Sequence, residues 1–163
     1  MKTTFLFFLM LLSTSAFCQS KFYIGFGLNQ QLLKKDTGIS YDGYVGYNFN
    51  EDIALNLFVT NSEMKSKDFD FNYKMDKYAV LVNYDFGKSK KSKFESVFGF
   101  SYLVIDKKLM LEKNSGLGFD LGFQTLFGLK NKLNYGFKII STFNSIAPGG
   151  ILNSGVLFRY NFK

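Results

Sequence analysis

Alternation between two kinds of residue runs through most of the sequence and constrains the fold more than any other feature. From residue 116 to residue 127, odd positions hold mainly leucine and phenylalanine, while even positions hold mainly glycine and polar residues. Period two is the side-chain period of a β-strand, and helical periodicity is almost absent. We therefore expect an all-β protein with eight alternating segments, at residues 21–29, 40–49, 53–60, 77–86, 94–104, 116–127, 133–143 and 155–162.

The two faces of these segments differ in charge. One face carries aromatic and aliphatic side chains and no charge, whereas the other carries most of the glycines together with Asp42, Lys77, Asp85, Glu95, Asp120, Lys138 and Arg159. A water-soluble barrel would turn its charges outward, but glycine is a poor residue for a solvent-facing strand, and so many aromatic rings would overfill a small interior. The pattern favours an inside-out, eight-stranded antiparallel up-and-down transmembrane β-barrel, with the apolar face toward lipid and a polar lumen.

The first residues have the layout of a secretory signal peptide. Lys2 precedes an apolar run over residues 5–12, and the small residues Ala16 and Cys18 occupy the positions that precede a cleavage site. The alternative is a lipoprotein signal in which Cys18 is acylated. Such signals have a small residue immediately before the cysteine, whereas this sequence has Phe17 there. The apolar run is too short to span a membrane as a helix. We expect a signal peptide over residues 1–18 and a barrel domain over residues 19–163 without cysteine.

Cleavage after Cys18 is directly testable. Protein purified from a bacterial envelope should begin at Gln19, and N-terminal mass spectrometry should detect this residue, cyclised or not, because Ala16 and Cys18 supply the spacing that signal peptidase requires. A diacylglycerol-modified Cys18 would contradict this expectation and place the protein among the lipoproteins.

The connections between the segments alternate in length. Three short links, at residues 50–52, 87–92 and 128–131, separate four generally longer ones at residues 30–39, 61–76, 105–115 and 144–150. Outer-membrane barrels have short periplasmic turns, longer outer loops and both termini in the periplasm. We therefore expect the outer membrane of a Gram-negative-type bacterium, with the termini in the periplasm.

The whole predicted mature chain resembles the small outer-membrane barrels, the porin-like β-barrel family that includes the OmpA and OmpX types. The strongest similarity lies at the end of the chain. The spacing of Gly155, Phe158, Tyr160 and Phe162 resembles the C-terminal signal that the barrel assembly machinery recognises. The usual terminal phenylalanine is displaced by Lys163. The resemblance implies that this machinery is a partner and that Gly155, Phe158, Tyr160 and Phe162 form the assembly signal.

No residue set in the sequence supports catalysis or cofactor binding. In the barrels of this kind that are enzymes, the catalytic sites resemble serine or aspartate sites built with histidine. This chain has no histidine. Ser101 would therefore lack a base, while Asp42, Glu95 and Asp120 do not have calcium-binding spacing. We predict no catalytic, cofactor or metal site. Nucleic acid is not expected as a partner, because the many lysines fit solvated loops or contacts with lipopolysaccharide and phospholipid headgroups.

The inward charges and large side chains predict a closed lumen in a monomeric barrel. Asp42, Asp120 and Lys138 should form one layer and Asp85, Glu95 and Arg159 another, with Asp120 paired to Lys138 on the neighbouring strand. An eight-stranded barrel has a bore that side chains just fill. Two functions remain open: a non-enzymatic structural or surface-interaction barrel with loops exposed to the exterior, and a small-solute, porin-like channel.

Overall fold

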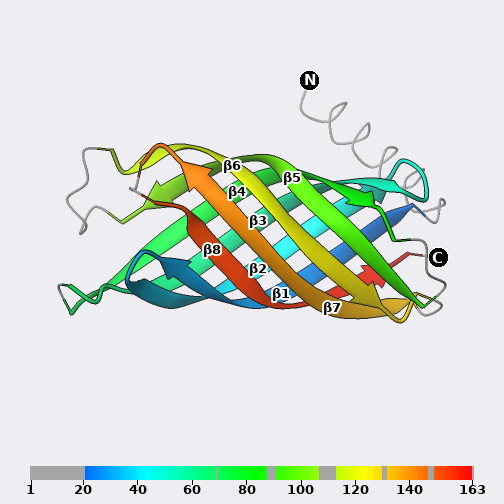
Figure 1. Ribbon diagram of the computed structural model, residues 1–163, viewed down its shortest axis with the longest axis horizontal. Coiled ribbons are helices and arrows are strands. Elements are labelled where there is room, and N and C mark those ends of the chain that lie inside the picture. Colours follow the sequence, from blue (N-terminus) through cyan, green and yellow to red (C-terminus); the bar gives the residue numbers. More distant parts are fainter. Residues whose placement is uncertain are drawn as a thin grey trace, which may run out of the picture.

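The computed structural model describes residues 21–68, 70–87, 91–106, 113–129, 132–146 and 149–162, which fold into one closed antiparallel barrel (Figure 1). Each strand pairs with its neighbour in sequence, and β8 closes the barrel against β1. The predicted eight-stranded up-and-down barrel is confirmed. The strands are β1 (Phe22–Leu33), β2 (Asp36–Asn48), β3 (Ile53–Lys65), β4 (Asn72–Asp85), β5 (Ser92–Ile105), β6 (Ser115–Phe127), β7 (Leu133–Asn144) and β8 (Ile151–Asn161).

β1 begins and β8 ends at the same end of the barrel, here called the terminal end (Figure 1). The opposite end, where the β1–β2, β3–β4, β5–β6 and β7–β8 connections lie, is called the distal end. The predicted signal peptide and its cleavage site lie outside the described residues. Within the described ranges, no helix is long and apolar enough to cross a membrane.

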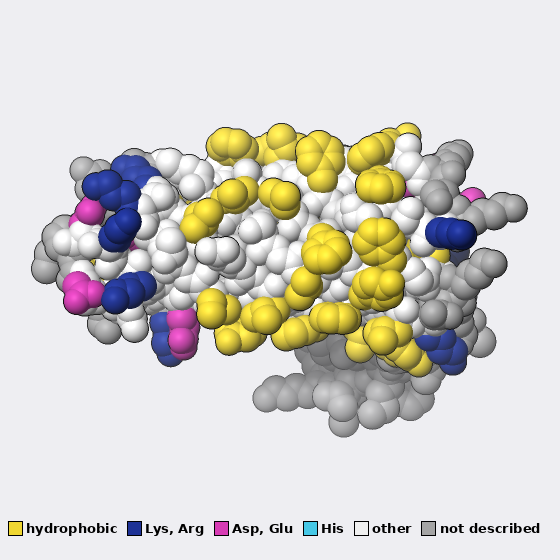
Figure 2. All heavy atoms as spheres, turned by 60° about the horizontal axis from the view of Figure 1, so that its bottom comes forward, with side chains coloured by type: hydrophobic (Ala, Val, Ile, Leu, Met, Phe, Trp, Pro, Cys, Tyr) yellow, Lys and Arg dark blue, Asp and Glu magenta, His cyan; other side chains and the backbone are white. Residues whose placement is uncertain are grey.

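The two faces of each strand are divided as the alternation predicts. Leu117, Phe137 and Phe100 on the outer face are 59–71% exposed, whereas Asp120, Val97 and Leu103 on the inner face are fully buried. On the face drawn in Figure 2, the outward apolar side chains form a broad band, here called the apolar belt, with charged side chains gathered toward the two ends. The barrel is therefore apolar outside, and its polar residues are packed inside.

The strands at the distal end are longer than the sequence pattern indicated. Residues 30–39 were expected to form a loop, but β1 and β2 continue through this region to a turn at Lys34 and Lys35, where Lys34 has a φ of 53°. β3 and β4 likewise extend into the expected loop at residues 61–76, where Glu63 pairs with Lys74. Polar outward residues are compatible with strands that project beyond the lipid, so the loss of the apolar face there marks the edge of the belt rather than the end of the strand.

Two tyrosines fill the interior above glycines of β1 and β2. Tyr23 lies directly opposite Gly46, and Tyr44 lies directly opposite Gly25. A Cβ on either glycine would overlap the ring of the opposing tyrosine. The two rings pack edge to face, with their centroids 6.3 Å apart. Glycine is required at these inward positions because the sheet must accept an aromatic ring against its backbone.

A valine at Gly46 should destabilise the barrel, while a valine at Gly43 on the same strand should be tolerated. A side chain at Gly46 would meet Tyr23 and Asn56, and overpacking of this kind costs about 1–3 kcal/mol. Gly43 is exposed on the outer face, and a Cβ added there would have no atom within 4 Å. Urea unfolding in lipid vesicles would compare the two variants, and equal losses would contradict this packing.

Candidate functional site: the barrel interior

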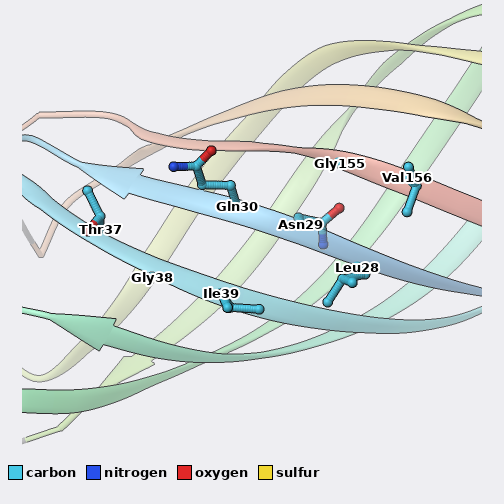
Figure 3. A pocket seen from close by; sticks show the side chains of 8 residues that line it. All are labelled: Leu28, Asn29, Gln30, Thr37, Gly38, Ile39, Gly155 and Val156. Carbon is cyan, nitrogen blue, oxygen red and sulfur yellow. The ribbon is translucent and has the colours of Figure 1, made fainter.

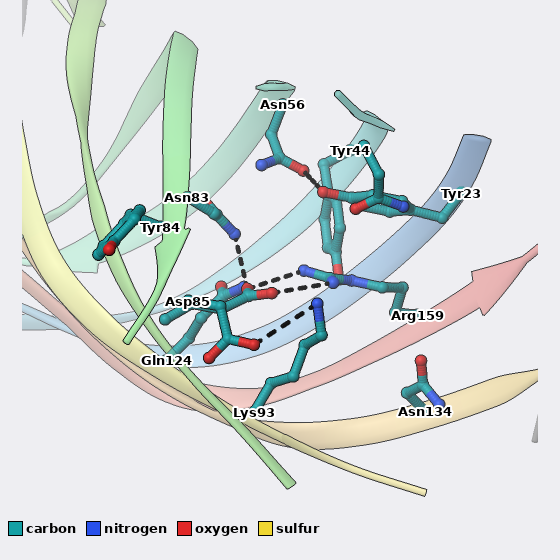
Figure 4. Close-up of polar contacts among 12 residues, drawn as sticks. Tyr23, Tyr44, Asn56, Asn83, Tyr84, Asp85, Lys93, Gln124, Asn134 and Arg159 are labelled. Carbon is teal, nitrogen blue, oxygen red and sulfur yellow. Dashed lines mark hydrogen bonds and ion pairs between the residues drawn. The ribbon is translucent and has the colours of Figure 1, made fainter. Parts of the chain in front are cut away.

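Glu95 is the centre of a buried polar cluster near the terminal end. Its carboxylate accepts hydrogen bonds from Arg159 at 3.2 and 3.4 Å, from Asn83 at 2.9 Å and from Gln124. Figure 4 shows Asn83, Gln124 and Arg159 converging from different strands. The Arg159 guanidinium also lies 4.1 Å from the centre of the Tyr23 ring. Such a buried charge is tolerated only because nearly every polar partner it needs is supplied by the surrounding strands.

A second pair beside this cluster involves Asp85. Its carboxylate lies 3.6 Å from the ammonium of Lys93, which also donates a hydrogen bond to the backbone carbonyl of Glu51. Lys93 is more exposed than the central residues, because it lies at the start of β5 close to the terminal end. This pair therefore borders the solvent, whereas the Glu95 cluster is enclosed.

Farther toward the distal end, Asp42 pairs with Lys138. Asp42 also accepts hydrogen bonds from Thr60 at 2.7 Å and from Asn29 at 2.8 Å, so both carboxylate oxygens are engaged. Gly27 leaves room for this pair, since a Cβ there would lie 2.8 Å from Asp42 Oδ2 and 3.5 Å from Lys138 Nζ. A small residue on β1 thus permits β2 and β7 to join across the interior.

The partner of Asp120 is Lys77, at 2.9 Å, with Thr142 as a further hydrogen-bond donor. The expected pairing of Asp120 with Lys138 is wrong. In the β6–β7 register, Asp120 lies opposite Thr142 and Lys138 lies opposite Gln124, so the two charges are at different heights. The alternation had already placed Lys77 on the inner face, and this was the signal that could have identified it as the missing partner.

The distal part of the interior contains an apolar cluster. Its buried side chains, each 5% exposed or less, are Leu33, Met64, Tyr73, Met75, Leu103, Ile105 and Ile151, here called the distal plug. Asp36 joins the hairpins above it, accepting hydrogen bonds from the Tyr73 hydroxyl at 2.9 Å and from the Lys67 backbone at 3.0 Å. Five of the seven plug residues, Leu33, Met64, Tyr73, Met75 and Ile105, were not predicted because they lie in segments 30–39, 61–76 and 105–115, which were expected to form loops.

Ser101 lies on the inner face of β5, directly opposite Gly118 of β6 and diagonal to Asp120. Ser101 is buried inside, whereas Ser96 lies on the outer face and donates a hydrogen bond to the backbone carbonyl of Tyr84. Among the described residues, no three histidine, cysteine, aspartate or glutamate side chains are grouped closely enough to hold a metal ion. The interior as described is an arrangement of ion pairs and packed apolar side chains.

The four residues of the expected assembly signal lie along β8 and just beyond it. Phe158 and Tyr160 face outward, 44% and 39% exposed, and Phe162 packs edge to face against Tyr160 at 5.4 Å. Gly155 lies close to β1, where a Cβ would collide with the backbone of Leu28 and Asn29. The aromatic residues thus form part of the apolar belt at the terminal end, and Lys163 lies outside the described residues.

Comparison with solved structures finds barrels of the same fold. The N-terminal barrel domain of Pseudomonas aeruginosa OprF matches with a TM-score of 0.58 and 12% identity, covering 85% of this chain and 96% of that one. Ail of Yersinia pestis, in complex with the heparin analogue sucrose octasulfate, matches with a TM-score of 0.53 and 12% identity, covering 86% and 97%. The outer-membrane enzyme PagL matches with a TM-score of 0.56 and 12% identity, covering 85% and 98%.

At such low identity these structures show a shared fold and leave the activity open. No curated protein sequence matches this chain. The family model for the outer membrane protein beta-barrel domain, in contrast, matches residues 4–162. With the closed barrel and its apolar outer belt, this match shows that the chain belongs to the outer membrane protein beta-barrel domain family, whose location is the Gram-negative outer membrane.

Proposed function

We propose that the protein is a non-enzymatic outer-membrane barrel with a closed interior, serving a structural or surface-interaction role. The observation that carries this proposal is the filling of the lumen at successive heights. The Glu95 cluster lies near the terminal end, the Asp42–Lys138 and Lys77–Asp120 pairs lie above it, and the distal plug lies above them. A solute moving along the axis would have to displace each layer, and this favours a scaffold over a channel.

The proposed orientation places the termini in the periplasm and the distal end outside the cell. Several distal connections carry lysines, such as Lys35, Lys65 and Lys67, which can contact anionic groups of lipopolysaccharide. The aromatic end of β8 would present the assembly signal to the barrel assembly machinery from the periplasmic side. The absence of histidine from the sequence supports a role without nucleophilic catalysis, although the fold also occurs in the enzyme PagL.

Conductance measurement tests this proposal. The folded protein, inserted into planar lipid bilayers, should pass no steady ionic current above the level of a protein-free bilayer, because its ion pairs and distal plug close the axis. A heat-unfolded sample of the same preparation controls for leakage caused by detergent. A reproducible unit current from the folded sample alone would replace the scaffold with the small-solute channel.

A further inference from the structure

The outer wall of β8, β1 and β2 contains a groove that the alternation of the sequence does not predict. It has a volume of about 620 Å³ and lies between Leu28, Ile39 and Val156 on the outer face, beside Gln30 and Thr37 (Figure 3). Leu28 and Ile39 are 43% and 54% exposed. The groove lies in the distal half of these strands and opens on the apolar face rather than into the lumen.

The groove continues toward the distal end through two further hollows. The first, of about 280 Å³, shares Thr37, Gly38 and Ile39 with the groove and adds Lys65. The second, of about 330 Å³, shares Thr37 and Lys65 with the first and adds Lys35 and Lys67. The three hollows, together called the depression, therefore follow one another from an apolar wall to a group of three lysines, with Glu63 and Asp70 also in the lining. Its polarity changes along its length as that of an amphiphile does.

The lysines at the distal end of this depression can accept an anionic group. Lys35 lies 3.3 Å from Asp68 and Lys65 lies 3.0 Å from Asp70, but both pairs are largely exposed to solvent. Exposed ion pairs contribute little, so these ammonium groups can exchange a carboxylate for a phosphate at small cost. The Lys67 ammonium has no ion-pair partner among the described residues, and Asp36 accepts its hydrogen bonds from the Lys67 backbone and from Tyr73 instead.

We propose that this depression binds one phosphorylated, acylated glycolipid of the outer leaflet, the class of lipid A, with an acyl chain along Leu28, Ile39 and Val156 and a phosphate at Lys35, Lys65 and Lys67. Gln30 lies directly opposite Ile39, and Thr37 lies two residues nearer the distal end than Ile39, so both offer polar groups to the linkages that join the chains of such a lipid to its phosphate-bearing head. The inference rests on the proposed function for its orientation, since only an exterior distal end places the groove in the outer leaflet.

Native mass spectrometry of the full chain, folded in detergent and titrated with bisphosphorylated lipid A, tests the site. We expect one bound lipid A and no comparable binding of phosphatidylcholine. Replacing Lys35, Lys65 and Lys67 together by alanine should weaken lipid A binding about a hundredfold, because each lysine near a charged lipid surface contributes on the order of a kilocalorie. The matched control replaces Lys21, Lys113 and Lys132, which lie outside the three hollows, and should leave binding unchanged.

A second variant tests the apolar part of the site. Ile39→Trp fills the groove and should weaken lipid A binding, while Leu117→Trp adds the same bulk to another part of the wall and should not. The gel shift between heated and unheated samples verifies that each variant folds. The proposal would be overturned if the two triple-lysine variants bound lipid A equally well, or if the two tryptophan variants did. Binding of phosphatidylcholine as tight as that of lipid A would also overturn it. If the protein fails to bind lipid A and passes no ionic current, only the lipid site is refuted and the closed scaffold remains. If the protein binds lipid A but passes current, only the closed scaffold is refuted.

Discussion

Replacing Lys138 by methionine should lower the free energy of unfolding by about 3–5 kcal/mol, because the change leaves the Asp42 carboxylate buried without its cation. Lys138 is 3% exposed and Asp42 is 2% exposed, so water cannot replace the lost ammonium from the surface. The hydrogen bonds from Thr60 and Asn29 remain, but they do not neutralise the charge. Urea unfolding in lipid vesicles, followed by the gel shift between heated and unheated samples, measures the loss.

The pairing itself is tested by two double variants. Lys138→Met combined with Asp42→Asn should cost less than the sum of the single changes, because no charge is then stranded. Lys138→Met combined with Asp120→Asn should be additive, since Asp120 pairs with Lys77 and Thr142 instead. Coupling to Asp120 and additivity with Asp42 would contradict the structure and restore the pairing expected from neighbouring strands.

The faces of the strands could be predicted from the sequence because strand parity is a local property. Each inward residue of the expected network, such as Asp120 or Arg159, is placed by the alternation of its own segment. The inward glycines follow the same rule, and Gly46 lies against Tyr23 as a glycine facing a crowded interior should. The fold class could therefore be predicted from the pattern within each strand and from the even number of strands.

The ion-pair partners could not be predicted in the same way, because the enclosed pairs join strands that are not neighbours in the sheet. Asp42 on β2 reaches Lys138 on β7, Lys77 on β4 reaches Asp120 on β6, and Glu95 on β5 reaches Arg159 on β8. Which heights meet across the lumen depends on the tilt and stagger of the closed barrel. The pair of Asp85 and Lys93 at the terminal end does join adjacent strands, but Lys93 was not part of the expected network.

If the outer face of the barrel contacts lipid, a substitution by lysine should be tolerated differently on the outer and inner faces of a strand. Leu121→Lys should destabilise the barrel by about 2–4 kcal/mol, because Leu121 is 48% exposed near the middle of β6 and would carry a charge into lipid. Gln124→Lys, on the inner face of the same strand, should cost less, because the new ammonium would lie beside the carboxylate of Glu95.

This comparison separates the inside-out barrel from a water-soluble one when unfolding is measured in vesicles and refolding is measured in a short-chain detergent. In a soluble barrel the exposed Leu121 would be a surface position, where lysine would be neutral or would improve solubility. In the lipid-facing barrel the penalty should be greater in vesicles than in the short-chain detergent, because the charge then lies farther from the interface. Equal stability of the two lysine variants in vesicles would refute the assignment of the apolar belt to lipid.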